Sequence, residues 1–304
     1  MRKLNYHLVD VFTNEMFGGN QLAVFTDCEN LPASYMQKIA KELNLAESTF
    51  VLPPKDSSHD HWVRIFTPAT ELPMAGHPTV GTAFVLVQQT ASLDESQQLR
   101  FMEGVGVIPV HVQIDNGATS LITMQQPLPE FGSHFTDRQL MADILSLSID
   151  AIDPNTPCEV VSTGLPFLFV PITSLDEIRR IRLRLDLWEQ ALKGFEAPQI
   201  FVFTQETERA DSTVHSRMFA PALGIMEDPA TGSASGPLGS YLVKHGLISV
   251  EDATKIVSEQ GFEIGRPSII RISISHEDNQ ISRVTVGGEC VAVGAGYINL
   301  NVAS

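Results

Sequence analysis

The stretch RIFTPATELPMAGHPTVGTA, residues 64–83, has a counterpart later in the chain, RMFAPALGIMEDPATGSA at residues 217–234. Both begin with R-x-F-x-P, continue through a short loop and end in P-x-x-G-x-A. The loop between the two prolines of this pattern differs by two residues, and the remainder is in register. The shared frame predicts an internal duplication, in which two similar domains each curl a sheet around one apolar helix.

Each copy of the pattern leads into a short apolar helix that starts at a proline. We expect these helices at residues 78–91 and 229–245, the second closed by Gly246. Proline suits the first helical turn because its missing N–H would have no acceptor there. Asp228 would then take the N-cap position. Small residues and few charges are typical of a helix buried on all sides, so each is predicted to form the centre of its domain.

The rest of the chain alternates apolar and polar residues, which predicts strands with few helices between them. Two amphipathic helices are expected at residues 33–45 and 136–147, the second capped by Thr136. The pattern predicts the α+β class with mostly antiparallel, curled sheets. We place the halves at 1–125 and 130–290, with a linker at 125–132, and the final strand near 290–304 is a candidate to join the first half.

Composition limits the classes of function. At 304 residues the chain has the length of two ordinary domains, and 43% hydrophobic residues are enough to fill two cores. A net charge of −16 would repel nucleic acid and anionic membranes. Cys28, Cys158 and Cys290 are far apart, which predicts neither a disulfide framework nor a structural zinc site. The first residues do not resemble a signal peptide, so a cytoplasmic protein is expected.

The starts of the two central helices are candidate anion sites. Free backbone N–H groups and the positive end of the helix dipole both favour a carboxylate there. If the halves pack face to face, the two helix starts would share one cleft, and a local attraction would hold an anionic substrate despite the net charge. The alternative interpretation is that both helices only support their cores.

Three ionisable side chains are candidates for proton transfer. His77 directly precedes the first central helix, and its ordinary pKa of about 6.5 suits a proton shuttle, although a histidine there can also cap the helix. Asp228 occupies the matching position in the second half, and acid and base from opposite sides of a cleft suit proton transfer. Glu47 follows the helix at 33–45 among apolar neighbours that would raise its pKa by desolvation; a solvated surface position is its alternative.

Other motifs carry little weight. Gly18 and Gly19 lie in a turn but do not form the GxGxxG of a dinucleotide site, and no Walker, HExxH or G-x-S-x-G motif is present. His59 and His61 are interpreted as a chance surface pair rather than metal ligands. Ser233 has no base fixed by spacing, so a serine nucleophile is a weak hypothesis, while a hydrogen bond from Ser233 to a ligand is plausible.

Five stretches in order match the motifs of one known family: VDVFT leading to FGGN (9–20), LAESTF (45–50), MAGHPTVG (74–81), EDPATGSA (227–234) and EQGFEIGRPS (259–268). Together they resemble the PhzF-like, phenazine-biosynthesis family over essentially the whole chain. The resemblance implies the two-domain diaminopimelate-epimerase-like fold, with a sheet rolled around a central helix in each domain. It also implies a homodimer.

The resemblance further implies an activity: isomerisation of trans-2,3-dihydro-3-hydroxyanthranilate by proton transfer, with no metal or organic cofactor. By resemblance, Glu47 is the general acid/base, and His77 and Asp228 assist it. A partly buried glutamate can exchange protons near neutral pH. The positions that match substrate contacts of the family are His77, Asp228 and Ser233, with backbone N–H groups of Gly76 and Gly232 beside them.

Two alternatives remain open. Thiol-based racemases of the same fold need a cysteine at the start of each central helix, where this chain has Ala75 and the pair Asp228–Pro229. An epimerase or racemase of a small amino acid is therefore disfavoured. The second alternative is a catalytically idle small-molecule-binding protein, which turnover dependent on Glu47 would exclude.

Overall fold

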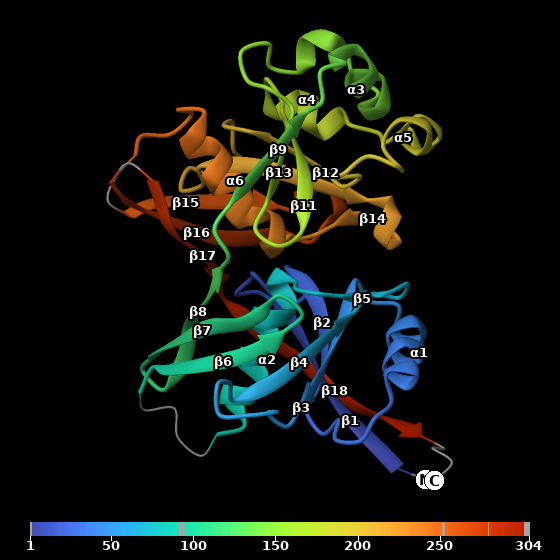
Figure 1. Cartoon of the computed structure of the whole chain (residues 1–304), viewed down its shortest axis with the longest axis vertical. Coiled ribbons are helices and arrows are strands. Elements are labelled where there is room, and N and C mark those ends of the chain that lie inside the picture. Colours follow the sequence, from blue (N-terminus) through green and yellow to red (C-terminus); the bar gives the residue numbers. More distant parts are fainter. Residues whose placement is uncertain (1, 91–94, 251–252, 279, 301–304) are drawn as a thin grey trace. The chain divides into compact units, whose positions relative to one another are not determined.

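The computed structural model describes residues 2–90, 95–250, 253–278 and 280–300 (Figure 1). The chain divides into two compact units. The first unit consists of residues 1–125 together with 287–304, and the second unit of residues 126–286. The second unit is thus a continuous segment, while the first is assembled from both ends of the chain.

The first unit rolls a mixed sheet around one helix. Along the sheet, β1 pairs antiparallel with β18 and β2, β2 parallel with β3, β3 antiparallel with β4, β4 parallel with β6, and β6 antiparallel with β7. Its strands are β1 (Arg2–Val11), β2 (Asn20–Phe25), β3 (Glu47–Leu52), β4 (His61–Phe66), β5 (Glu71–Leu72), β6 (Gln97–Glu103), β7 (Gly106–Asp115), β8 (Ala118–Gln126) and β18 (Cys290–Leu300), and its helices are α1 (Ala33–Leu43) and α2 (Gly76–Gln88).

The second unit repeats this order of pairings. Here β10 pairs antiparallel with β11, β11 parallel with β12, β12 antiparallel with β13, β13 parallel with β15, and β15 antiparallel with β16. Its strands are β9 (Glu130–His134), β10 (Glu159–Ser162), β11 (Pro166–Pro171), β12 (Ile200–Thr204), β13 (Val214–Ala220), β14 (Ile225–Asp228), β15 (Ala253–Gln260), β16 (Ser268–Glu277) and β17 (Gln280–Gly288), and its α-helices are α3 (Arg138–Leu145), α4 (Leu175–Arg180), α5 (Leu185–Ala191) and α6 (Gly232–Lys244). The predicted α+β class and the duplication are confirmed.

The central helices α2 and α6 are buried along almost their whole length, because small residues let the strands approach them (Figure 1). A Cβ added at Gly81 of α2 would lie 2.7 Å from side-chain atoms of Leu22 and Val11. Hydroxyl groups within the helices are satisfied locally: Thr79 donates to the carbonyl of Ala75 (2.6 Å). Steric fit rather than amphipathicity therefore keeps these helices in the core.

The arginine of each R-x-F-x-P motif has the same role in both units. In the first unit, Arg64 donates from Nε and Nη2 to the carboxylate of Glu71, at 2.7 Å each. In the second, Arg217 donates from the same two atoms to Glu227, at 2.8 Å each. Each guanidinium also lies over the ring of the phenylalanine two residues later, at 5.2 and 5.1 Å. Each arginine thereby fixes the short strand that leads into its central helix.

These pairs correct the register of the repeat. With Glu71 and Glu227 aligned, Pro73 matches Pro229, so the sequence-based alignment of Pro229 with Pro78 is wrong by five residues. Pro78 lies inside the first turn of α2, whereas Pro229 lies before α6 begins at Gly232. P-x-x-G-x-A recurs because small residues line both helices, not because the six positions correspond.

Several predicted boundaries also need correction. Helix α3 is capped by Asp137, whose side chain accepts from the N–H of Leu140 (2.9 Å), and not by Thr136. Helix α1 ends before residue 45 because Asn44 takes a left-handed conformation with φ 53°. The expected linker at 125–132 is mostly strand, since β8 ends at Gln126 and β9 begins at Glu130. Residue 91, the expected end of the first central helix, lies outside the described residues.

The two arginines make a matched test of burial. The side chains of Arg217 and Glu227 are 5% and 15% exposed, against 16% and 42% for Arg64 and Glu71. We expect Arg217→Met to lower the free energy of unfolding by about 3–5 kcal/mol, because a buried carboxylate loses its cation. Arg64→Met is expected to cost about 1 kcal/mol or less. Urea unfolding followed by tryptophan fluorescence measures both, and equal losses would contradict the prediction.

Candidate active site

Glu47 and His77 meet in the first unit although 30 positions separate them. Glu47 is the first residue of β3 and His77 lies in the first turn of α2. Nε2 of His77 is 3.0 Å from Oε2 of Glu47, and the two residues are 3% and 7% exposed. On the other side of the ring, Nδ1 is 3.1 Å from Nδ2 of Asn20, which begins β2. The structure thus joins the predicted acid/base to one predicted helper.

The imidazole of His77 is neutral at physiological pH. Burial lowers its pKa to about 3, against a small opposing effect of a hydrogen bond to the backbone of Gln21. The amide Nδ2 of Asn20 can only donate, so Nδ1 of the neutral imidazole is the acceptor there and the ring proton lies on Nε2, which faces the Glu47 carboxylate. The 3.0 Å between Nε2 and Oε2 is an ion-pair distance, and this contact does not have the geometry of a hydrogen bond.

The prediction that His77 precedes the helix is wrong, because the helix begins two residues earlier than predicted. Ala75 is the N-cap of α2, and Gly76 and His77 are its first two residues. The backbone N–H groups of the first turn of a helix have no carbonyl acceptor within that helix, and those of Gly76 and His77 belong to this turn. This end of α2 has the character of a carboxylate site.

In the second unit, Asp228 is the last residue of β14 and not the N-cap of α6. That position belongs to Thr231, because three residues separate the strand from the helix. The hydroxyl of Thr231 donates to Oδ2 of Asp228 (2.6 Å), and Asp228 is buried. Gly232 and Ser233 are the first two residues of α6. Ser233 is thus the counterpart of His77. Asp228 corresponds to Leu72 of the first unit and not, as the sequence had predicted, to His77.

Gln260, which the sequence did not single out, holds this loop. Its Nε2 donates to the carbonyl of Asp228 (2.7 Å) and to Oγ1 of Thr231 (2.9 Å). Its Oε1 accepts from the backbone N–H of Thr231 (3.1 Å). A further bond runs from the hydroxyl of Ser268 to the carbonyl of Pro229 (2.9 Å). Gln260 and Ser268 both lie in the stretch EQGFEIGRPS, so the motif was visible but its role required the structure.

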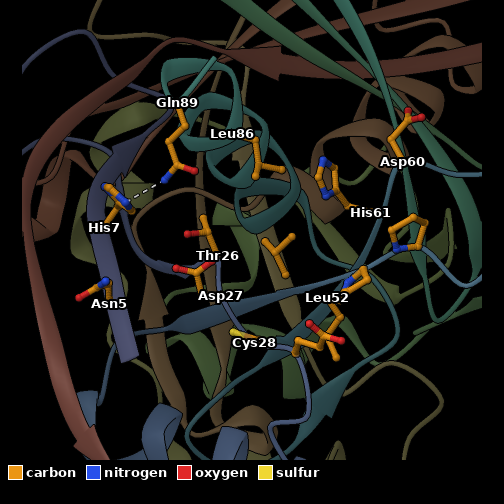
Figure 2. A pocket seen from close by; sticks show the side chains of 14 residues that line it. Asn5, His7, Thr26, Asp27, Cys28, Leu52, Asp60, His61, Leu86 and Gln89 are labelled. Carbon is orange, nitrogen blue, oxygen red and sulfur yellow. Dashed lines mark hydrogen bonds between the residues drawn. The ribbon is translucent and has the colours of Figure 1, made fainter. Parts of the chain in front are cut away.

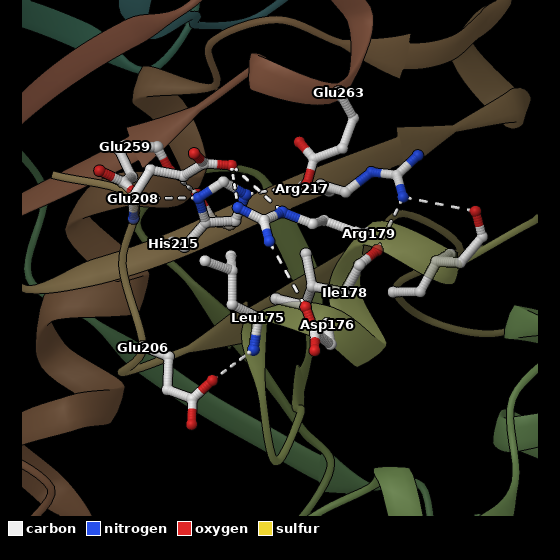
Figure 3. A network of polar contacts seen from close by, with 12 residues as sticks. Leu175, Asp176, Ile178, Arg179, Glu206, Glu208, His215, Arg217, Glu259 and Glu263 are labelled. Atoms are coloured by element: carbon white, nitrogen blue, oxygen red, sulfur yellow. Dashed lines mark hydrogen bonds and ion pairs between the residues drawn. The ribbon is translucent and has the colours of Figure 1, made fainter.

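A histidine between two carboxylates anchors the same stretch (Figure 3). Nδ1 of His215 is 2.8 Å from Glu259 and Nε2 is 2.9 Å from Glu263. Burial alone would lower the pKa of His215, but the hydrogen bonds to the two glutamates outweigh it and raise the pKa to about 9. The pKa values of both glutamates are lowered despite burial, by their bonds to His215 and to backbone N–H groups. An ionised network therefore fixes Glu259, the neighbour of Gln260.

The thiols are not placed for two-cysteine chemistry. The structural counterparts at the two helix starts are Ala75 and Thr231, which corrects the assignment of the second position to residues 228–229. Burial raises the pKa of Cys28 and of Cys158 to about 12 and also raises that of Cys290. Thiols in this state are poor bases and nucleophiles near neutral pH.

A pocket of about 670 Å³ lies at the opposite end of α2 from His77 (Figure 2). Figure 2 shows Leu86 and Gln89 at this end, with Gln89 bonded to His7 (2.9 Å). None of the predicted site residues lines the pocket. His61 does line it, while His59 is 2% exposed and bonded to the backbone of Lys55, so the interpretation of a surface histidine pair is wrong.

The described residues contain neither a cluster of metal-binding side chains nor a helix that could span a membrane. Within residues 2–90, 95–250, 253–278 and 280–300, no three His, Cys, Asp or Glu side chains gather in an arrangement that could hold a metal ion. Over the same ranges, the helices are too short or too polar to span a membrane.

Comparison with known proteins gives consistent matches over the full length. The model of the family described as phenazine biosynthesis-like protein matches residues 9–296. The chain is 37% identical to trans-2,3-dihydro-3-hydroxyanthranilate isomerase of Pseudomonas fluorescens, covering 97% of this chain and 99% of that protein. It is 34% identical to an uncharacterized isomerase of Clostridium acetobutylicum, covering 99% and 100%. A Bacillus anthracis phenazine biosynthesis protein of the PhzF family superposes with a TM-score of 0.88 at 26% identity, covering 99% and 100%.

The His215 network predicts a pH-dependent stability. A histidine pKa raised from 6.5 to about 9 means that, between these values, the folded chain binds more protons than the unfolded chain. The stabilisation is therefore complete below about pH 6.5 and is lost as the pH rises through about 9. We expect His215→Gln to be less stable than wild type by about 3 kcal/mol near pH 6, with the gap shrinking toward pH 9.

Urea unfolding at several pH values measures this gap, and His111→Gln, at an exposed position of β7, is the control. A gap that stays constant from about pH 6 to about pH 9 would show that His215 is not charged in the folded protein.

Proposed function

Because the chain belongs to the phenazine biosynthesis-like family, we propose that it is a cofactor-independent isomerase that moves a proton within a small carboxylate substrate. The observation that carries the proposal is the buried pair of Glu47 and His77, 3.0 Å apart at the start of a buried helix. A buried carboxylate that lies beside the N–H of a neutral imidazole is suited to general acid/base catalysis.

Glu47 is the proposed general acid/base. Its carboxylate takes a proton from one carbon of the substrate and returns the proton to another carbon. The double bonds shift accordingly, so substrate and product are isomers and Glu47 ends in its starting state. The N–H at Nε2 of His77 faces the carboxylate and stabilises the ionised form of Glu47, the form that acts as the base.

The substrate carboxylate is proposed to bind at the first turn of α2. The N–H groups of Gly76 and His77 supply donors there, and the helix dipole adds a favourable potential. The first turn of α6, with Gly232 and Ser233, has the same build. We propose that these two residues and Asp228 contact the same substrate; this part rests on the family resemblance and on the matching construction of the two helix starts.

The substrate to test first is trans-2,3-dihydro-3-hydroxyanthranilate, which the name of the Pseudomonas fluorescens relative specifies. It carries the carboxylate and the conjugated system that the proposed chemistry needs. The positions of the three thiols argue against the racemase alternative.

Replacement of Glu47 tests the chemistry. In deuterated buffer we expect wild type to isomerise the substrate with exchange of the transferred proton, and Glu47→Gln to lose at least about 10²-fold in kcat because the amide cannot act as a base. Mass spectrometry and absorbance measure both quantities. Glu42→Gln, an exposed glutamate of α1, is the control and should behave as wild type.

Turnover by Glu47→Gln at the wild-type rate would contradict the role of Glu47. Folded wild type that leaves this substrate unchanged would contradict the substrate, and other small unsaturated carboxylates would then be tested.

We propose, on the resemblance alone, that the protein is a cytoplasmic homodimer. Light scattering during size-exclusion chromatography should then give twice the chain mass of 33.3 kDa. A mass equal to one chain at micromolar concentration would contradict the dimer.

A further inference from the structure

Glu103 is a buried carboxyl that the proposed mechanism does not use. It is the last residue of β6, and its counterpart in the second unit is Gln260, the last residue of β15. Both strands pair in parallel with the strand that carries the R-x-F-x-P arginine. Gln260 holds the start of α6, which raises the question of what Glu103 does at the start of α2.

The turns after these residues are alike in both units. A Cβ added at Gly104 would lie 2.8 Å from the carbonyl oxygen of Pro73, and one added at Gly261 would lie 2.5 Å from that of Pro229. In each unit a glycine therefore lets the strand end pack directly on the loop before the central helix. Glu103 and Gln260 occupy equivalent places in equivalent surroundings.

The hydrogen bonds of Thr79 determine where the proton of Glu103 lies. Oγ1 of Thr79 is 2.6 Å from the carbonyl oxygen of Ala75 and 2.6 Å from Oε1 of Glu103. A threonine hydroxyl has one proton to donate. The carbonyl oxygen has none, so Thr79 donates to Ala75 and the second short contact is satisfied when Glu103 donates to Thr79.

We propose that Glu103 is a positioning residue that is held protonated and, through Thr79, fixes the N-cap of the helix that carries Gly76 and His77. The chain of bonds runs from the carboxyl of Glu103 to the hydroxyl of Thr79 and on to the carbonyl of Ala75. The protonation state of Glu103 can be tested without any reaction, whereas the effect of Glu103 on catalysis rests on the function proposed above.

The surroundings of Glu103 favour the neutral form. The residue is 4% exposed, and among the described residues its Oε2 has no hydrogen-bond partner. Burial raises its pKa to about 8, and the bond with Thr79 opposes this only in part. On β4, Arg64 is already paired with Glu71. The other ionisable side chains on β6 and on the elements packed against it are His61 on β4, His77 on α2, Arg100 on β6, and His111 and Asp115 on β7.

Loss of the proton would change the site. An ionised Glu103 would draw the hydroxyl proton of Thr79 to itself, and the carbonyl of Ala75 would lose its bond from that hydroxyl. It would also place a second negative charge near the helix start that binds the substrate carboxylate. Activity should therefore fall as the pH rises through about 8.

Glu103→Gln is the decisive variant, because it copies Gln260 and keeps an N–H donor for Thr79 without a titratable proton. We expect its kcat at pH 7 to stay within about twofold of wild type and its activity to persist at least one pH unit further into the alkaline range. Thr79→Val should lose roughly fivefold to tenfold in kcat, and Thr79→Ser should recover most of the loss.

Infrared difference spectra of wild type against Glu103→Gln supply a readout that needs no substrate. We expect the carbonyl band of a protonated carboxyl at pH 7, replaced by carboxylate bands as the pH rises through about 8. The proposal is overturned if Glu103 is already a carboxylate at pH 7, if Glu103→Gln loses more than tenfold in kcat, or if it keeps the wild-type alkaline decline. If the chain turns over no substrate, the infrared titration still decides the protonation state.

Discussion

The start of each central helix is buried, and its first-turn N–H groups cannot be satisfied within the helix. This constraint organises both units. The loop before each helix must therefore be fixed in position, because it sets which groups surround those N–H groups. An arginine–glutamate fork on the preceding strand, a glycine turn against a proline carbonyl, and one residue at a strand end together provide that support. The chemistry is placed where the fold leaves donors available.

The two copies of this framework have diverged at the positions that face the helix start. The first unit has His77 next to Glu47, the pair proposed to take part in proton transfer. The second has Ser233 and an aspartate held by Thr231, which offer hydrogen bonds without a buried imidazole. The supporting residues differ as well, with Glu103 in one unit and Gln260 in the other. In the proposed function, one copy of the duplicated scaffold supplies the acid–base residues and the other supplies substrate contacts.

Much of the fold could be predicted from the sequence, because strand alternation and small-residue helices are local properties. The register of the repeat could not. The Arg64–Glu71 and Arg217–Glu227 pairs are separated by different loop lengths, so their equivalence is visible only once strands pair. The family resemblance links Glu47 to His77, but no spacing rule predicts that residues 30 apart in sequence approach to 3.0 Å. Glu103 resembles any strand residue in sequence, since its burial comes entirely from its neighbours.

The pairing of β1 with β18 extends from Arg2 opposite Leu300 to Val11 opposite Cys290. During synthesis on the ribosome, β1 can therefore complete this pairing only after residues 290–300 have been added. The second unit is continuous, so all its strands emerge before β18 does. The sheet of the unit that contains the proposed general base therefore gains β18 only after the second unit has been synthesised, which departs from the usual N-terminal-first order of domain completion.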